Sequence, residues 1–187
     1  VLAFANTALS SAASMVVWML IEALVQKKCT VMGAVTGGIV GLVGITPGAG
    51  YVPLWSSLII GATAAPICYL AISKMKKKFG YDDALDAFGC HGVGGIWGGI
   101  ATGLFGKTSV NSVARWNGLV FGDFHLFTAQ LISILVTIAV AVCGTLICIG
   151  IVRIFTPLRV DVSDEISGLD FSQHGENAYP SFNGFDS

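Results

Sequence analysis

The sequence contains few charged residues. Of its 187 residues, 11% are Asp, Glu, Lys or Arg, which is under half of the roughly 25% that is typical of soluble domains. Ten basic residues are offset by eleven acidic ones, which leaves a formal net charge of -1. Without a basic excess the chain lacks the electrostatic footprint of a nucleic-acid-binding protein, so we expect no nucleic-acid partner.

The sequence also lacks the short motifs of common enzymes and metal sites. It contains no Walker-type phosphate loop, no nucleophile elbow and no HExxH pair. Five Cys residues are scattered without a CxxC pair, which argues against a disulfide framework and against a zinc site. The glycines after His91 do not follow a predicted strand, so they do not form a dinucleotide fingerprint. We therefore expect no enzyme activity, no cofactor and no metal.

Long apolar runs are abundant instead. Hydrophobic residues make up 54% of the chain, and the mean hydropathy is +0.78. A helix needs about 20 apolar residues to cross a bilayer, and residues 1–21, 29–73, 87–106 and 124–152 contain no charged residue. The second run is interrupted by TPGAG at residues 46–50, so it predicts two helices joined by a turn. The pattern predicts an all-α membrane bundle with five spans, near residues 1–26, 31–45, 54–74, 83–105 and 126–155.

The basic residues predict the orientation of these spans. Most of them follow the first, third and fifth spans: Lys27, Lys28, Lys74, Lys76, Lys77, Lys78, Arg153 and Arg159. The other two, Lys107 and Arg115, lie between the fourth and fifth spans. Because short basic loops stay on the cytoplasmic side, we expect an extracytoplasmic start and a cytoplasmic tail. This divides the chain into a membrane domain, residues 1–155, and an acidic tail, residues 156–187.

Glycines repeat every four residues on two of the predicted spans. The repeats are Gly33, Gly37 and Gly41 on the second span and Gly95, Gly99 and Gly103 on the fourth. Glycines at this spacing line one face of a helix and let two backbones approach closely. The pattern therefore predicts tight helix pairs, and it is consistent both with generic packing and with the wall of a narrow pore.

One ionisable residue, His91, lies near the middle of the fourth predicted span. Ionisable groups at membrane depth are costly, and they usually face the interior of the bundle. Removal from water disfavours the charged imidazole, so we expect a neutral ring that offers one donor and one acceptor to a polar solute. A structural histidine, bonded to a carbonyl of a neighbouring helix, is the alternative that position alone leaves equally open.

Acidic residues cluster at the start of the same span. Asp82, Asp83 and Asp86 precede its apolar part, where carboxylates complement the positive end of the helix dipole and cap free N–H groups. We therefore expect Asp83 and Asp86 to have structural roles at the helix start.

Three blocks of sequence carry a family resemblance. They are GLVGITPGAGY (residues 41–51), DALDAFGCHGVGGIWGGIATGLF (residues 83–105) and GLDFSQHGENAY (residues 168–179). In this order they resemble the ammonium transporters, which are related to the Rhesus proteins. The resemblance covers nearly the whole chain but only the C-terminal half of the family's eleven-helix protein. The missing initial Met fits the same expectation, that this chain is part of a longer protein.

The resemblance implies a transport function and a site. It implies that ammonium or ammonia, with methylammonium as an analogue, crosses the plasma membrane through a hydrophobic pore. His91 matches the second of two pore histidines, whose partner lies on an earlier helix. Thr46 matches a residue near the pore at the broken end of a helix. Two alternatives remain open: a Rhesus-type gas channel, and a non-conducting ammonium sensor or scaffold of the same fold. The GLDFSQHGENAY block favours the ammonium transporter branch over the gas channel.

The resemblance also implies regulation at the tail. In the family, the tail packs against neighbouring protomers of a homotrimer. The residues that match this docking segment are Gly168, Asp170, His174, Gly175 and Tyr179. Ser172 falls where plant relatives carry a threonine whose phosphorylation closes the pore. A kinase or a nitrogen-signalling protein is therefore an implied partner, beside the substrate and the lipid bilayer.

Overall fold

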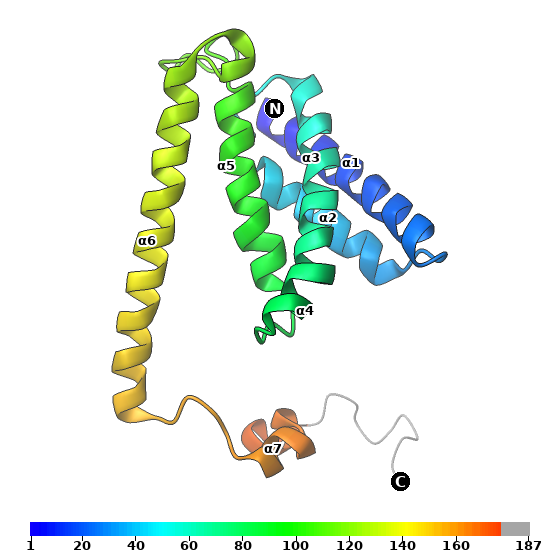
Figure 1. The fold of residues 1–187 in the computed structure, drawn as a ribbon, viewed down its shortest axis with the longest axis vertical. Helices are drawn as coiled ribbons and strands as arrows, with labels where there is room; N and C mark the ends of the chain where they lie inside the picture. Colours follow the sequence, from blue (N-terminus) through cyan, green and yellow to red (C-terminus); the bar gives the residue numbers. More distant parts are fainter. Residues whose placement is uncertain (177–187) are drawn as a thin grey trace. The chain divides into compact units, whose positions relative to one another are not determined.

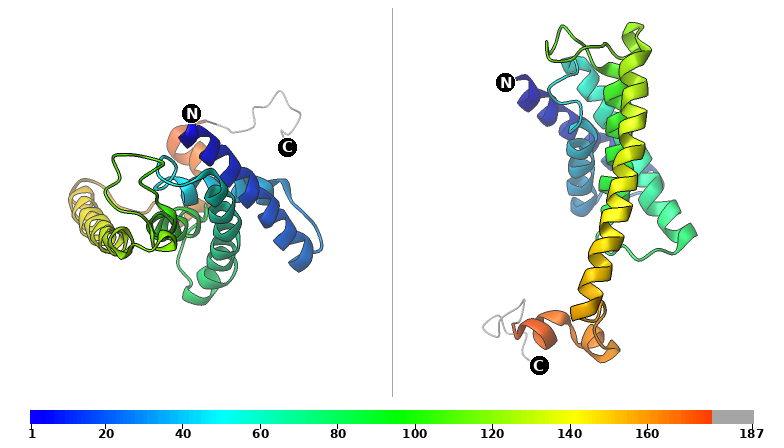
Figure 2. Two further views of the ribbon diagram at one scale, coloured as in Figure 1. Left: turned by 90° about the horizontal axis from the view of Figure 1, so that it is seen from above. Right: turned by 90° about the vertical axis from the view of Figure 1, so that its left-hand side faces the viewer.

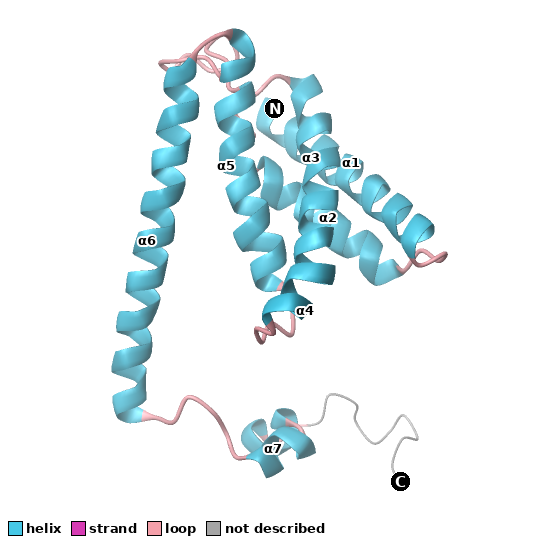
Figure 3. Ribbon diagram, viewed as in Figure 1, coloured by secondary structure: helices cyan, strands magenta, loops and turns pink. Residues whose placement is uncertain are grey.

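The computed structural model describes residues 1–176, and its regular secondary structure is all helical (Figures 1 and 3). No strand occurs in this part of the chain, so the all-α prediction is confirmed. The chain divides into two compact units, Val1–Thr137 and Ile138–Ser187. Each unit is described by itself below.

The helices of the first unit follow one another along the chain, and their longest connection, residues 106–118, lies between α5 and η3 (Figure 2). They are α1 (Leu2–Val25), α2 (Val31–Ile45), α3 (Leu54–Leu70) extended by η1 (Ala71–Met75) and α4 (Lys76–Phe79), η2 (Phe88–Val93) joined to α5 (Gly94–Phe105), and the short η3 (Leu119–Phe121). The long helix α6 (Phe124–Phe155) begins in the first unit and ends in the second. The second unit also contains α7 (Val162–Ser167) and η4 (Asp170–His174).

Three helices within residues 1–176 are long and apolar enough to cross a membrane: Leu2–Val25, Leu54–Phe79 and Phe124–Phe155. The helix Val31–Ile45 is apolar but shorter. The predicted start of the fourth span at residue 83 is too early, because the chain turns before it becomes helical. Asp86 has a φ of 54°, in the left-handed region, and this conformation interrupts the helix before Phe88.

Helix α1 buries a polar stripe against its neighbours. Its buried residues recur every four positions: Asn6, Ser10, Ser14, Trp18 and Glu22. The Ser10 hydroxyl donates to the Gly41 carbonyl at 2.8 Å, and the Asn6 amide donates to the carbonyls of Ala49 and Val52. These bonds tie α1 to the backbone of α2 and to the turn that follows it. Such interhelical bonds hold helices together where surrounding lipid is as apolar as the helices themselves.

Glycines make this close contact possible on both α2 and α3. A Cβ atom at Gly41 would lie 2.4 Å from the carbonyl oxygen of Ser10, and one at Gly61 would lie 2.1 Å from the same atom. A Cβ atom at Gly37 would lie 2.6 Å from the Cβ of Trp18. Gly37 and Gly41 of α2 therefore face α1, and three helices converge at one carbonyl of α1.

The glycines of the fourth predicted span do not form one uniform interface. A Cβ at Gly99 would meet Ile134, and a Cβ at Gly103 would meet the backbone of Phe127, so both glycines face the first part of α6. Within residues 1–176, no atom beyond Gly95's own helix backbone and chain neighbours lies within 4 Å of a Cβ built at Gly95. The expected repeat is thus divided between a helix contact and an open face.

Glu22 anchors the start of α2. Its side chain is buried, and its carboxylate accepts the Thr30 N–H at 2.9 Å. The Thr30 hydroxyl in turn accepts the N–H of Gly33 at 2.8 Å, as an N-cap residue does. A Cβ at Gly33 would lie 2.1 Å from the Glu22 carboxylate. Gly33 therefore leaves the space that this carboxylate occupies.

We expect G61A to destabilise the protein by about 1 to 3 kcal/mol, the usual range for overpacking. The new methyl group would collide with the Ser10 backbone, which cannot move aside as a flexible side chain could. The matched control is G144A, because no atom of the described residues lies within 4 Å of a Cβ at Gly144. The melting temperatures of G61A and G144A are measured by thermal unfolding of the detergent-solubilised intact protein. Equal melting temperatures for the two variants would contradict the assigned contact.

Candidate functional site

His91 lies on an exposed face of the helix formed by η2 and α5. It is in the first turn of this helix, whereas the sequence predicted a residue near the middle of the span. Within residues 1–176 the imidazole makes no hydrogen bond, ion pair or ring contact. Gly95, one turn further along, borders open space. The described residues therefore do not supply the carbonyl partner that a purely structural histidine would need.

The local packing of η2 explains why His91 points away from the bundle. Gly89 and Cys90 are buried, and a Cβ at Gly89 would lie 2.5 Å from Ile72. A Cβ at Gly94 would lie 3.2 Å from Val43 on α2. The small residues thus hold one side of the helix against α2 and α3, which leaves His91 on another side. The segment Phe88–Val93 is a π-helix, a rare form that occurs frequently at functional sites.

Thr46 lies at the end of α2 and is also exposed. Its hydroxyl donates to the Leu42 carbonyl at 2.7 Å, and its oxygen retains lone pairs that can accept a hydrogen bond. The turn after it is fixed by a bond from the Gly48 N–H to the Ile45 carbonyl and by Asn6 of α1. The expected turn between two helices is therefore present, with the Thr46 side chain at its entrance.

The structure places His91 and Thr46 on neighbouring helices but not in contact. Gly94 faces Val43, and Gly98 faces the Gly44 carbonyl and Pro47, so α2 and α5 run in the same direction here. His91 lies one turn before Gly94, and Thr46 lies one turn after Val43. Six residues of helical rise therefore separate the two side chains, about 9 Å along the helices.

Two aspartates hold the start of the helix that carries His91. The Asp83 carboxylate accepts the N–H groups of Ala87 and Phe88 at 2.8 and 2.9 Å. Asp86 pairs with the Lys76 ammonium group at 2.7 Å, and Lys76 also donates to the Asp83 carbonyl. Both carboxylates therefore position the helix and do not themselves contact His91. The sequence pattern does not predict that Lys76 pairs with Asp86.

Several polar residues of α1 were not predicted to contact other helices, although their spacing is visible in the sequence. The four-residue recurrence of Asn6, Ser10 and Ser14 on one helix face is a signal for a polar helix interface. Asn6 matters most for the site, because it fixes the turn that presents Thr46.

The tail residues of the second unit surround a short π-helix, η4. Gly168 and Gly175 flank it with φ values of 94° and 66°, which other residues rarely adopt. The Ser172 hydroxyl is exposed and donates to the Gly168 carbonyl at 3.1 Å. Asp170 and His174 are the first and last residues of η4. Tyr179, the last residue of the expected docking segment, lies outside the described residues.

An ion pair fixes the connection that precedes α7. The Arg159 guanidinium donates to both oxygens of the Glu165 carboxylate, at 2.7 and 3.2 Å. This hydrogen bonding lowers the pKa of the Glu165 carboxyl below its ordinary value. Glu165 is therefore charged at neutral pH and joins α7 to the segment after α6.

Residues 1–179 match the Ammonium Transporter Family. The chain is 50% identical over 177 residues to the ammonium transporter of Bacillus subtilis (strain 168), which covers 95% of this chain and 44% of that protein. The chain belongs to the Ammonium Transporter Family. This relative is named as a transporter, in agreement with the expectation that the chain is not an enzyme.

Solved structures of the Ammonium Transporter Family match the fold as well. The crystal structure of Candida albicans Mep2 gives a TM-score of 0.77 at 32% identity and covers 87% of this chain and 37% of that one. Saccharomyces cerevisiae Mep2 gives a TM-score of 0.68 at 35% identity, over 74% and 34% of the two chains. This chain of the Ammonium Transporter Family is thus a multi-pass membrane protein, and it spans less than half the length of these relatives.

We expect D83A to lower the stability of the intact protein by about 1 kcal/mol, as loss of a helix cap does. The substitution removes the acceptor of two N–H groups at the helix start. D82A is the matched control, because Asp82 is exposed and makes no hydrogen bond or ion pair in the described part. The melting temperatures of D83A and D82A are compared with that of the unchanged protein. A control that loses as much stability would show a general charge effect instead of capping.

Proposed function

We propose that the intact protein conducts ammonium or ammonia across the membrane, and that His91 contacts the permeating species. One observation carries this proposal: a membrane helix of the Ammonium Transporter Family exposes an imidazole for which the described residues provide no partner. A histidine in this position can donate or accept one hydrogen bond without a fixed charge.

The physical chemistry of the substrate supports a neutral ring. Carrying an ammonium ion through a narrow apolar passage is costly unless the charge is compensated. Desolvation favours neutral ammonia over ammonium, and a neutral imidazole can offer polar contacts to it along the way. Thr46 contributes a further hydroxyl near the end of α2, and Asp83 and Asp86 position the helix that presents His91. The partner histidine belongs to the part of the protein outside this chain.

We also propose a membrane topology and an assembly for the intact protein. Residues 1–155 form the membrane domain, and residues 156–187 form a cytoplasmic tail of a plasma-membrane protein. The intact protein is a homotrimer in which the segment from Gly168 to Tyr179 docks on neighbouring protomers. The exposed Ser172 is the residue on which a kinase acts, and a nitrogen-signalling protein is a further partner at this face. A phosphate there would add negative charge close to Asp170 and disfavour a packed interface.

We expect H91A to reduce methylammonium uptake about tenfold or more, because the permeating species loses a polar contact that water cannot replace. Uptake is measured in cells that lack their own ammonium transporters and express the intact protein. H125A is the matched control. His125 is exposed at the start of α6 and is already bonded to Asp123 at 2.7 Å.

The outcomes of this experiment separate the candidate functions. Unchanged uptake in H91A, with normal expression, would defeat the pore assignment. An inactive wild-type protein that still binds ammonium would favour the sensor or scaffold. Equal conduction of uncharged gases would favour the Rhesus-type channel.

For the tail, we expect S172D to lower uptake severalfold, since added charge beside Asp170 opposes docking. S167D is the control, because Ser167 is also exposed and its hydroxyl also donates to a carbonyl four residues earlier. Cell-surface expression is measured alongside uptake. Equal uptake in S172D and S167D would remove Ser172 from the proposed regulation.

A further inference from the structure

Two cysteine side chains that the proposed conduction does not use are buried together inside the first unit. Cys68 of α3 and Cys90 of η2 carry free thiols and belong to the same cluster of buried residues. A Cβ atom at Gly94, one turn after Cys90, would lie 3.3 Å from the Cys68 sulfur. Cys90 also lies close enough to Cys68 to interact with it electrostatically. The two thiols are therefore neighbours at the contact between the two helices.

The surroundings of this thiol pair are apolar. The rest of the cluster consists of Trp18, Val40, Ala64 and Ala65. Neither thiol makes a hydrogen bond within residues 1–176. Besides filling space, a free thiol can bind a metal ion through its sulfur. The two cysteines lie on different helices, so no sequence motif marks them as a pair.

The number and type of the donors select the ion that would fit. No third His, Cys, Asp or Glu joins the two thiols in the part of the chain that the structure describes. A structural zinc ion takes four ligands, which this pair does not supply. Soft metal ions prefer thiolate sulfur, and mercury(II) binds two thiolates in a linear arrangement. A divalent ion between two thiolates leaves the site neutral, which avoids the cost of burying a charge.

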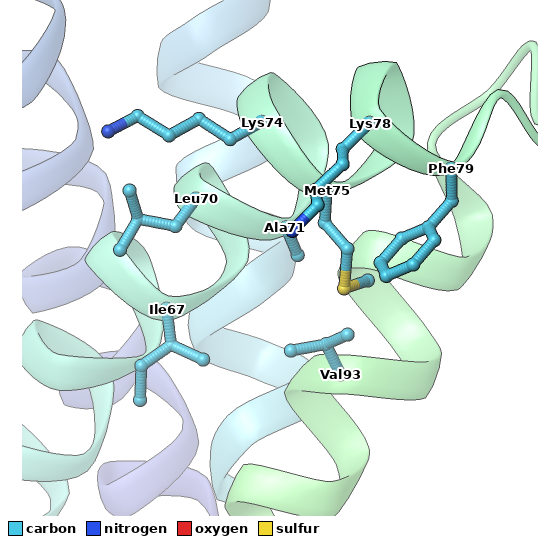
Figure 4. Close-up of a pocket in the computed structure, with 8 residues that line it drawn as sticks. All are labelled: Ile67, Leu70, Ala71, Lys74, Met75, Lys78, Phe79 and Val93. Atoms are coloured by element: carbon cyan, nitrogen blue, oxygen red, sulfur yellow. The ribbon is translucent and has the colours of Figure 1, made fainter.

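A recess that opens to the surface gives small solutes access to this region (Figure 4). Its volume is about 410 Å³, and its lining includes Ala71 and Val93. Ala71 follows Cys68 by three residues, and Val93 follows Cys90 by three residues, so each lies about one helical turn from a cysteine. A neutral complex such as mercury(II) chloride can therefore approach both thiols without carrying a charge into the apolar interior.

We propose that Cys68 and Cys90 together bind a soft divalent metal ion, for which mercury(II) is the probe. Each thiol releases its proton, and two mercury–sulfur bonds replace the two mercury–chlorine bonds of mercury(II) chloride. Two protons and two chloride ions leave, and no electron is transferred. The bound ion links α3 to η2 at the residue before His91. This metal site does not depend on the proposed transport.

The test compares mercury retention by variants of the purified intact protein, which is reduced beforehand and freed of reductant. Native mass spectrometry gives the concentration of glutathione, a monothiol, that removes half of the bound mercury. We expect C68A and C90A each to hold mercury about a hundredfold less tightly, because either substitution leaves attachment at one point only. The double variant C68A/C90A should then be no weaker than either single variant. C143A is the matched control and should hold mercury unchanged, because Cys143 is a free, exposed thiol on α6.

X-ray absorption of the unchanged protein is a second measurement, and it needs no substitution. At one mercury ion per protein, after the glutathione wash, we expect two sulfur neighbours and no chloride. The proposal is overturned by equal retention in C68A and the unchanged protein, by losses that add in the double variant, or by a single sulfur neighbour. A loss in C143A as large as in C68A would also overturn it.

A consequence for conduction rests, in addition, on the proposed function. Protein interiors are close-packed, so an ion placed between two helices in contact must displace them, and Cys90 directly precedes His91. We expect mercury(II) chloride to lower methylammonium uptake severalfold in liposomes that contain the intact protein, and C68A to be protected. Bound mercury with unchanged uptake would overturn this consequence but not the metal site. Equal inhibition of C68A and the unchanged protein would place the inhibition at another thiol.

Discussion

The close approach of three helices at one carbonyl group of α1 is the constraint on which the first unit depends. Gly41 of α2 and Gly61 of α3 both face the Ser10 carbonyl, and a methyl group on either would collide with it. Lipid is as apolar as the helix surfaces, so hydrophobic burial does not drive these helices together. Backbone contact and hydrogen bonds from the polar stripe of α1 take its place.

The position of His91 follows from this constraint by a short series of contacts. Helix α2 meets α1 through Gly37 and Gly41, and it meets α5 through Val43 and Gly44. Gly94 and Gly98 dock on that second side. Because these glycines pack against α2, the larger side chains of the same helix point to its other sides. His91 is one of these side chains. The face of α2 that touches neither partner carries Met32, Val35, Ile39, Leu42 and Thr46, all of them exposed.

Much of the fold follows from the sequence, because charge-free runs and turn residues mark helices with little ambiguity. The predicted second span, residues 31–45, and the predicted end of the fifth span at residue 155 agree with the structure to the residue. The start of the fourth span is not predictable in this way. A run of apolar residues does not reveal that Asp86 adopts a left-handed conformation or that its carboxylate pairs with Lys76.

The sequence points to a candidate residue for the site but not to its geometry. An ionisable residue in an apolar run makes His91 a candidate because of the cost of placing it there. Its exposure depends on which helix face the glycines occupy, and glycines at every fourth position are compatible with several faces. The same ambiguity explains why Gly95 borders open space while Gly99 contacts α6.

The exposure of His91 also limits what this chain can do by itself. A passage for a polar solute needs a wall on every side, because an imidazole that faced acyl chains would gain no polar partner. Within residues 1–176, α2 and α5 provide one side of such a wall, and the space in front of Gly95 is open. The relatives are more than twice as long as this chain. Under the proposed function, the opposite wall of the passage and the second histidine must therefore come from the part of the relatives' sequence that this chain does not match.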